Sequence, residues 1–314
     1  MAKINHKKDL AITQNVKNKQ PKFEFTLKQQ KYIFVYSCLL IPLLFFIVIR
    51  FAPTLYTFIV GFREWDILSP EKPFVGMDNY VNLFKDEVFL KSMLNTIIYV
   101  VVGVSGQLII GLAIALMLQR INRFVGLFRV IYFIPYITSI VAVSWVFKWL
   151  LMPNGIVNDW LVKLGFESQL FLGSPTQAIY VIIATMIWQG LGFQMIIFLA
   201  GLENIPKMFY EAADIDGANG WHKFKSITIP LLNPTIVFSA VIGSIGFLQS
   251  FTQVLNMTQG GPLNSSNTMV HYIYQLAFQQ YKMGYAAAAT VILFLIVLLL
   301  TLFQMKVLTK KFEY

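Results

Sequence analysis

The apolar residues of this chain gather in long runs that are separated by shorter polar stretches. A membrane-spanning helix needs about 20 predominantly apolar residues to cross the ~30 Å hydrocarbon layer. Six runs reach that length, at about 32–62, 93–118, 128–151, 178–201, 235–257 and 283–306. The pattern predicts an all-α membrane protein with six transmembrane helices, in which a transmembrane domain at 32–307 lies between tails at 1–31 and 308–314.

The fourth and fifth runs hold more polar residues than contact with lipid favours. The fourth includes Gln189 and Gln194, and the fifth includes Ser250 and Gln253. Amides and hydroxyls in the middle of a span are costly unless they face a cavity or a neighbouring helix. Two interpretations therefore stay open for each residue: contact with a translocated polar solute, or packing between helices.

The polar stretch at 202–234 separates these two runs and predicts a short helix, a turn and a second short helix. Pro206 suits the first turn of a helix, where its missing N–H costs nothing. Gly217 can adopt the left-handed conformation that ends a helix, and Asn219 can cap the next one. That second helix carries an apolar stripe at three-residue spacing, formed by Trp221, Phe224 and Ile227.

Composition and charge place the chain in a membrane. Hydrophobic residues make up 57% of it and charged residues only 13%, which is far from the balance of a soluble globular protein. The net charge of +10 could suggest a nucleic-acid partner, but the basic residues cluster in segments that flank the spans.

Positive charge marks the cytoplasmic side of a membrane protein. With both termini, the link at 119–129 and the stretch at 202–234 inside, 17 of the 25 Lys and Arg lie on the cytoplasmic side and six lie in outer loops. We therefore predict a multi-pass protein of the cell membrane, in contact with lipid, with both termini cytoplasmic and no nucleic-acid partner.

The sequence offers no candidate for catalysis. It has no Gly-x-x-x-x-Gly-Lys-(Ser/Thr) phosphate loop, and its three histidines show no metal-ligand spacing. One cysteine, Cys38, excludes a disulfide framework within the chain. We expect no enzyme activity, catalytic residue, metal or cofactor in this chain.

The remaining chemistry is recognition inside the membrane. Backbone groups within a span are paired in the helix, so a translocated solute must meet side chains. Amides and hydroxyls suit a neutral solute with many hydroxyls, and aromatic rings suit the apolar faces of pyranose rings. The fourth and fifth runs contain polar amides and hydroxyls as well as aromatic rings. They contain no charged side chain, which disfavours an ionic solute.

The stretch at 202–234 also carries a family pattern. Glu211-Ala212-Ala213, Gly217 and Ile227-Thr228-Ile229-Pro230 resemble the signature loop of ABC importer permeases, the inner-membrane components of binding-protein-dependent transport systems; Ile229 stands where Leu is usual. In that family the loop is a coupling helix that docks in a groove of a cytoplasmic ATPase subunit. The resemblance implies an ATPase-coupling role for Glu211, Ala212, Ala213, Asp214, Gly217, Ile227 and Pro230.

Further motifs resemble the carbohydrate-uptake subgroup of these permeases, and the similarity runs from about Tyr32 to the C-terminus. They include Phe74-Val75-Gly76-Met77-Asp78-Asn79-Tyr80 and the run that begins at Gly260-Gly261-Pro262. In that subgroup the sugar site lies near mid-membrane on the spans either side of the signature loop. By position, this implies a substrate path at Gln189, Gly190, Phe193, Gly243, Phe247 and Ser250.

The resemblance implies an assembly with a second homologous permease, two ATPase subunits that bind ATP and Mg²⁺, and an external solute-binding protein. The expected cargo is a sugar, by preference an oligosaccharide, whose identity the sequence does not specify. One alternative is an ABC permease for another solute, such as glycerol phosphate. A second is an ion-coupled secondary transporter, which would predict Asp, Glu or His inside the spans.

Overall fold

The computed structural model describes residues 26–121 and 123–308, and over these ranges it is helical apart from turns, loops and two isolated β-bridges. The chain divides into two compact units, Met1–Tyr56 and Thr57–Tyr314. Of the tails predicted at 1–31 and 308–314, only residues 26–31 and 308 lie within the described ranges.

The first apolar run forms one long helical segment, Leu27–Val60. It comprises α2 (Leu27–Phe46), a π-helical turn (Ile47–Phe51) and α3 (Ala52–Val60). Thr26 starts α2 with a capping box, because the Gln29 side chain reaches back to the backbone N–H of Thr26 (3.0 Å). The helix therefore begins earlier than the apolar count predicts.

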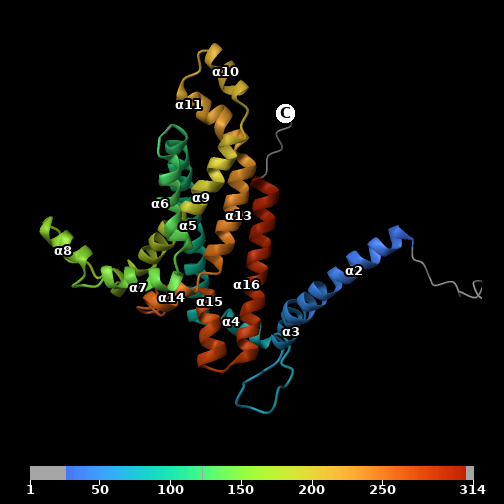
Figure 1. Cartoon of the computed structure of the whole chain (residues 1–314). Helices are drawn as coiled ribbons and strands as arrows, with labels where there is room; N and C mark the ends of the chain where they lie inside the picture. Colours follow the sequence, from blue (N-terminus) through green and yellow to red (C-terminus); the bar gives the residue numbers. More distant parts are fainter. Residues whose placement is uncertain (1–25, 122, 309–314) are drawn as a thin grey trace, which may run out of the picture. The chain divides into compact units, whose positions relative to one another are not determined.

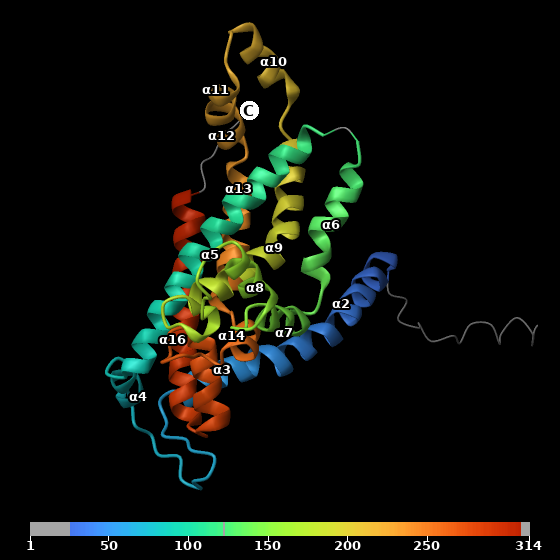
Figure 2. The ribbon, with the colours of Figure 1, turned by 90° about the vertical axis from the view of Figure 1, so that its left-hand side faces the viewer.

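Four long helices dominate the second unit, and they run side by side in Figures 1 and 2. They are α5 (Glu87–Gln119), α9 (Ala178–Glu203), α13 (Asn233–Leu248) and α16 (Met283–Phe303), which continues into a π-helical turn at Gln304–Leu308. Among the described residues, four helical segments are long and apolar enough to cross a membrane, and up to six if each of two bent pairs counts as one span.

Helix α5 lies at the centre of this bundle. Asp86 caps its first turn by accepting hydrogen bonds from the backbone N–H groups of Val88 (2.8 Å) and Phe89 (3.1 Å). The helix then packs along α9 and α13, where fully buried side chains such as Tyr99 and Ile182 join one apolar cluster. The candidate site forms where these three helices meet.

The third apolar run does not form one helix. It divides into α6 (Val125–Ile137) and α7 (Ile140–Leu150), which meet at an angle of 93°. Thr138 and Ser139 have extended ψ values, and Pro135 lies within the last turn of α6. An apolar count cannot detect this bend, because both halves are apolar and only the backbone dihedral angles differ.

The fifth run is also interrupted. Helix α13 ends at Leu248, and the chain resumes as a short helix, α14 (Thr252–Met257). At its other end, α13 meets the preceding helical segment Gly220–Leu231 at 65°. Pro230 and Pro234 flank this bend, as expected for residues that cannot donate a backbone hydrogen bond.

Side chains of α5 fix the segment that follows α14. The Asn95 side chain donates to the backbone oxygens of Asn264 and Asn267 (2.9 Å each). Thr268 begins α15 (Met269–Tyr274) and donates from its hydroxyl to the Ser250 backbone oxygen (2.8 Å). These bonds satisfy carbonyls in the non-helical backbone on either side of α14, and they hold α14 in place.

Two further polar residues of α15 form side-chain hydrogen bonds at the same end of the bundle. The Tyr272 hydroxyl donates to the Asp86 carboxylate (2.6 Å), and burial together with this carboxylate raises the pKa of Tyr272. His271 Nδ1 lies 2.7 Å from Asn267 Oδ1, and burial lowers the pKa of His271. Both shifts favour the uncharged side chains at neutral pH.

The contact of α6 with α9 generates a prediction about Gly192. A Cβ at this position would overlap the Tyr132 backbone oxygen and lie 2.6 Å from Phe133 Cα. We expect Gly192→Ala to lower the free energy of unfolding, because overpacking costs about 1–3 kcal/mol and the α6 backbone cannot move aside locally. Thermal unfolding of the detergent-purified protein measures this.

Gly126→Ala is the matched control, since a Cβ there has no neighbour within 4 Å. In a helix, Ala is favoured over Gly by about 1 kcal/mol, so this variant should unfold at the same or a higher temperature. Equal loss of stability in both variants would show that close packing is not what requires glycine at position 192.

Candidate functional site

A pocket of about 250 Å³ opens between α5, α9 and α13, and the ends of α6, α7 and α14 complete its wall. Its lining consists of apolar, aromatic, glycine and glutamine residues: Gln107, Tyr136, Ile140, Met186, Gln189, Gly190, Phe193, Gln194, Ile242, Gly243, Gly246, Phe247 and Gln253. This lining contains no Asp, Glu, Lys, Arg or His.

Five of the six residues assigned to a substrate path from the sequence line this pocket: Gln189, Gly190, Phe193, Gly243 and Phe247. Ser250 does not. It follows the end of α13, its side chain is buried, and its hydroxyl has no hydrogen-bond partner among the described residues. The regular helical spacing from Gly243 to Ser250 fails because α13 stops at Leu248.

Aromatic rings form one side of the pocket. Phe193 stacks on Tyr136 of α6, with the ring centroids 4.9 Å apart and the planes within 11°. Phe247 is almost fully buried, and its ring lies against the α5 backbone where Gly103 leaves room for it. Phe193 and Tyr136 are more exposed, so they present the more accessible ring surface to a bound molecule.

Glutamine amides supply the polar groups of the pocket. Gln189 donates to the backbone oxygen of Thr138 (3.2 Å), the cap residue directly after α6. Gln194 Nε2 is buried and has no hydrogen-bond partner among the described residues. Neutral donors and acceptors beside stacked rings can bind an uncharged molecule that carries hydroxyl groups and apolar faces.

Sequence reasoning missed Gln107 and Tyr136. Gln107 lies in the second apolar run, where the surrounding residues gave no reason to expect a cavity. The available signal was an amide between glycines at positions 103, 106 and 111. Tyr136 reaches the pocket only because α6 ends beside it, which depends on the bend.

The stretch at 202–234 forms a second candidate site, which lies at the end of the bundle opposite α4 (Asp78–Leu83) in Figure 2. It consists of α10 (Lys207–Ile215), α11 (Gly220–Lys223), a π-helical turn (Phe224–Thr228) and α12 (Ile229–Leu231). The short helix, turn and second helix expected from the sequence are therefore present. Pro206 lies just before the first residue of α10 instead of within its first turn.

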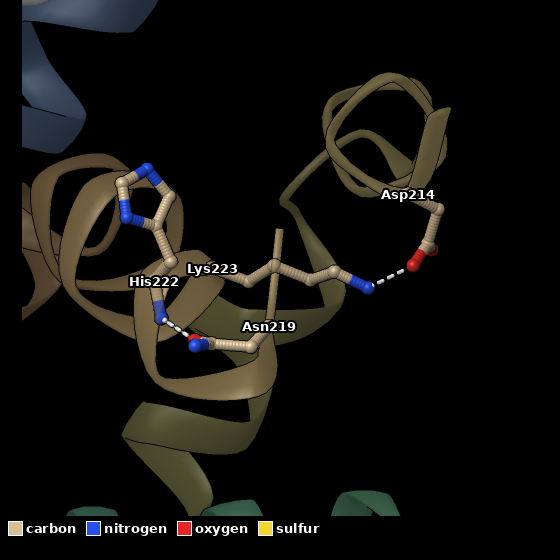
Figure 3. Close-up of polar contacts among 4 residues, drawn as sticks. All are labelled: Asp214, Asn219, His222 and Lys223. Atoms are coloured by element: carbon tan, nitrogen blue, oxygen red, sulfur yellow. Dashed lines mark hydrogen bonds and ion pairs between the residues drawn. The ribbon is translucent and has the colours of Figure 1, made fainter. Parts of the chain in front are cut away.

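The turn has the predicted conformation. Gly217 has φ +72°, the left-handed region, and the Ala218 N–H closes the end of α10 by donating to Ala213 O (2.9 Å). The Asn219 side chain accepts from the His222 N–H (2.8 Å), which confirms Asn219 as the cap of α11. Figure 3 shows this cap beside an ion pair between Asp214 of α10 and Lys223 of α11.

Five of the seven predicted coupling residues fall into two groups. Glu211 and Ala212 are exposed on α10, on the face that also carries Met208 and Ile215, residues that are 66% and 88% exposed. Asp214, Ile227 and Pro230 instead belong to the internal structure of the loop, because Asp214 pairs with Lys223 and the other two are half-buried. Ala213 is half-buried and Gly217 is exposed at the turn.

Comparison with known proteins finds a family match over most of the chain. Residues 107–314 match the family described as binding-protein-dependent transport system inner membrane component. The lactose transport system permease protein LacF of Rhizobium radiobacter is 39% identical over 237 residues, which cover 74% of this chain and 80% of LacF.

Solved structures share the fold. A crystal structure of a bacterial ABC transporter involved in the import of the acidic polysaccharide alginate contains a chain with TM-score 0.79 and 26% identity, covering 89% of this chain and 96% of that one. A second structure, of the bacterial alginate transporter in complex with an alginate pentasaccharide-bound periplasmic protein, gives TM-score 0.77 and 25% identity, covering 88% and 93%.

Proposed function

The chain belongs to the family of binding-protein-dependent transport system inner membrane components, and from that premise we propose that it is a permease subunit of an ATP-driven importer for a neutral oligosaccharide. The pocket between α5, α9 and α13 is the proposed place where the sugar crosses. It unites Gln189, Gly190, Phe193, Gly243 and Phe247, and Ser250 is withdrawn from the set because the pocket does not include it.

The observation that carries this proposal is the chemistry of the pocket lining. Sugars present hydroxyls that donate and accept hydrogen bonds, together with apolar ring faces. Glutamine amides match the hydroxyls, and the stacked Phe193 and Tyr136 match the ring faces. A permease for glycerol phosphate or another anion would be expected to place a basic residue there, and none lines this pocket.

The cargoes of the similar proteins agree with a sugar. LacF belongs to a lactose transport system, and the structural relative imports the acidic polysaccharide alginate. The uncharged lining distinguishes the pocket of this chain from one suited to an acidic polymer, so a neutral sugar is the proposed substrate class.

The exposed face of α10 is the proposed contact with an ATPase subunit. Met208 and Ile215 offer exposed apolar surface of the kind that marks an interaction site, and Glu211 offers a charge that can pair with a basic residue of the partner. In the proposed assembly, two ATPase subunits bind ATP and Mg²⁺ and hydrolyse the nucleotide. Closure of these subunits moves the loops of this chain and of a second permease together.

A solute-binding protein on the outer side is the remaining proposed partner. The alginate transporter has been crystallised with its sugar-bound periplasmic protein, which supports the same arrangement here. An ion-coupled secondary transporter is disfavoured, because family membership points to an ATP-driven importer and no carboxylate or histidine lines the pocket.

The proposed topology has six membrane crossings and cytoplasmic termini, in which each bent helix pair counts as one crossing. Because positive residues mark the inner side, the loop around Asn219 should be cytoplasmic. Asn219→Cys on a Cys38→Ala background should react with a membrane-impermeant maleimide only after the cells are opened. Labelling in intact cells would contradict the orientation.

Substrate contact is tested by uptake of a panel that includes lactose, arabinooligosaccharides and glycerol 3-phosphate. Gln189→Ala and Phe247→Ala should slow sugar uptake roughly three- to ten-fold, since each removes a hydrogen bond or a ring from the pocket. Phe238→Ala is the control, because Phe238 lies on the same helix as Phe247 and is exposed away from the pocket. Unchanged uptake in both pocket variants would assign Gln189 and Phe247 to helix packing. Transport of glycerol 3-phosphate alone would favour the alternative, a permease for glycerol phosphate.

Coupling is tested at Gly217 and Glu211. Gly217→Pro should prevent co-purification of the ATPase subunit and abolish transport, because proline fixes a negative φ where the turn requires +72°. Gly217→Ala should be milder, with a strain of roughly 1–2 kcal/mol. Glu211→Ala should weaken association by more than the ~0–1 kcal/mol of an exposed pair, since the docked carboxylate is partly desolvated.

Gly220→Ala serves as the control for coupling, since position 220 has no positive φ and a Cβ there meets nothing within 4 Å. All variants should reach the membrane at normal levels, because none lies in a span. Normal ATPase association and transport by Gly217→Pro and Glu211→Ala would show that the loop is a passive linker.

A further inference from the structure

One polar side chain of α5, Gln107, reaches the pocket between two glycines on the same helix face. Gly103 and Gly111 lie one turn before and one turn after it. A Cβ at Gly103 would overlap the Phe247 ring, and a Cβ at Gly111 would lie 2.9 Å from Gln194 Cγ. The two glycines therefore bring Phe247 and Gln194 against α5 on either side of Gln107.

Two more glycines face Gln107 from the neighbouring helices. Gln107 Nε2 occupies the volume that a Cβ at Gly190 of α9 would need. Gln107 Oε1 lies 3.5 Å from the Cβ position of Gly243 on α13. The carboxamide thus lies across the gap between α9 and α13, and any larger side chain at position 190 would displace it.

The amide of Gln107 has no hydrogen-bond partner among the described residues, although it is partly buried and lines the pocket. A glutamine amide offers two donors and two acceptor lone pairs. Nearby, the fully buried Gln194 Nε2 is also without a partner. Leaving the buried Gln194 Nε2 unpaired costs free energy, and the partly buried Gln107 amide lines the same pocket, so the two amides together point to a molecule that completes their hydrogen bonds.

We propose that Gln107 is a specificity-determining residue that contacts the transported molecule directly. Its carboxamide donates to one hydroxyl and accepts from a neighbouring hydroxyl of a neutral sugar, while Gln194 supplies a further donor. This inference rests on the proposed function of the pocket. It also assigns Gly190 a different role from the one expected from the sequence: Gly190 makes room for Gln107.

The test uses the complete importer with its binding protein in proteoliposomes, and the probe is the sugar from the uptake panel that the wild type transports fastest. Its monodeoxy analogues are transported in parallel. The wild type should discriminate about three- to ten-fold against the analogue that lacks the hydroxyl bound by Gln107, which corresponds to one hydrogen bond. Gln107→Ala should transport this analogue and the parent sugar at similar rates.

Two variants separate recognition from structure. Gln107→Glu keeps the size and the acceptor atoms but loses the donor, so it should change which analogue is disfavoured. Ser105→Ala, on an exposed face of the same helix, should keep the wild-type pattern. If the Gln107→Ala importer discriminates among the analogues as the wild type does, the inference about Gln107 is overturned and the sugar-permease proposal stays intact. If the wild type transports no sugar of the panel, both the inference and the sugar-permease proposal are overturned.

A second measurement tests the contact with Gly190. Gly190→Ala should slow sugar uptake in the wild-type background by displacing Gln107, but should add little in the Gln107→Ala background, where the space is free. Size-exclusion chromatography of the importer confirms that each variant assembles. Additive losses from the two substitutions would show that Gly190 serves helix packing alone, and this would contradict the proposed placement of Gln107.

Discussion

The structure depends on one constraint: a backbone carbonyl or N–H group away from water must find a hydrogen-bond partner within the protein. Regular helices satisfy it by themselves, and the interrupted helices do not. At the first interruption the Gln189 side chain donates to Thr138 O, and at the second the Thr268 hydroxyl donates to Ser250 O. Both interruptions lie beside the pocket, and at the first of them Gln189 both completes the backbone and lines the cavity.

Glycine determines how closely the helices around this cavity approach. Gly192 lets the α6 backbone lie directly against α9, and Gly103 and Gly111 let side chains of α13 and α9 reach the backbone of α5. A bundle packed through large side chains would separate these helices and widen the cavity. Small residues at the helix contacts keep the pocket narrow, and glutamine and aromatic side chains form much of its lining.

Sequence reasoning succeeded where a local pattern determines the outcome. Apolar runs predicted the helical membrane protein, and the left-handed Gly217 and the Asn219 cap followed from residue type and spacing. For polar residues such as Gln189 and Gln194 in mid-span, the sequence left cavity lining and helix packing both open, and the structure places them in the pocket lining. Sequence reasoning failed where contacts between distant segments determine the structure. It did not predict the 93° bend after α6 or the early end of α13, which excludes Ser250 from the pocket. It also did not predict that Gln107 approaches α9 and α13.

The two connections between the pocket and the polar loop differ in stiffness. On one side, α9 runs without a break from Gln189 to Glu203, a rod of about 20 Å at 1.5 Å per residue. Buried Ile205 then anchors the short link to α10 against Leu202 and Leu232. On the other side, the 65° joint before α13 separates the loop from Phe247. A displacement of the loop would therefore reach the Gln189 wall along one continuous helix, whereas it would reach the Phe247 wall only through a bent joint.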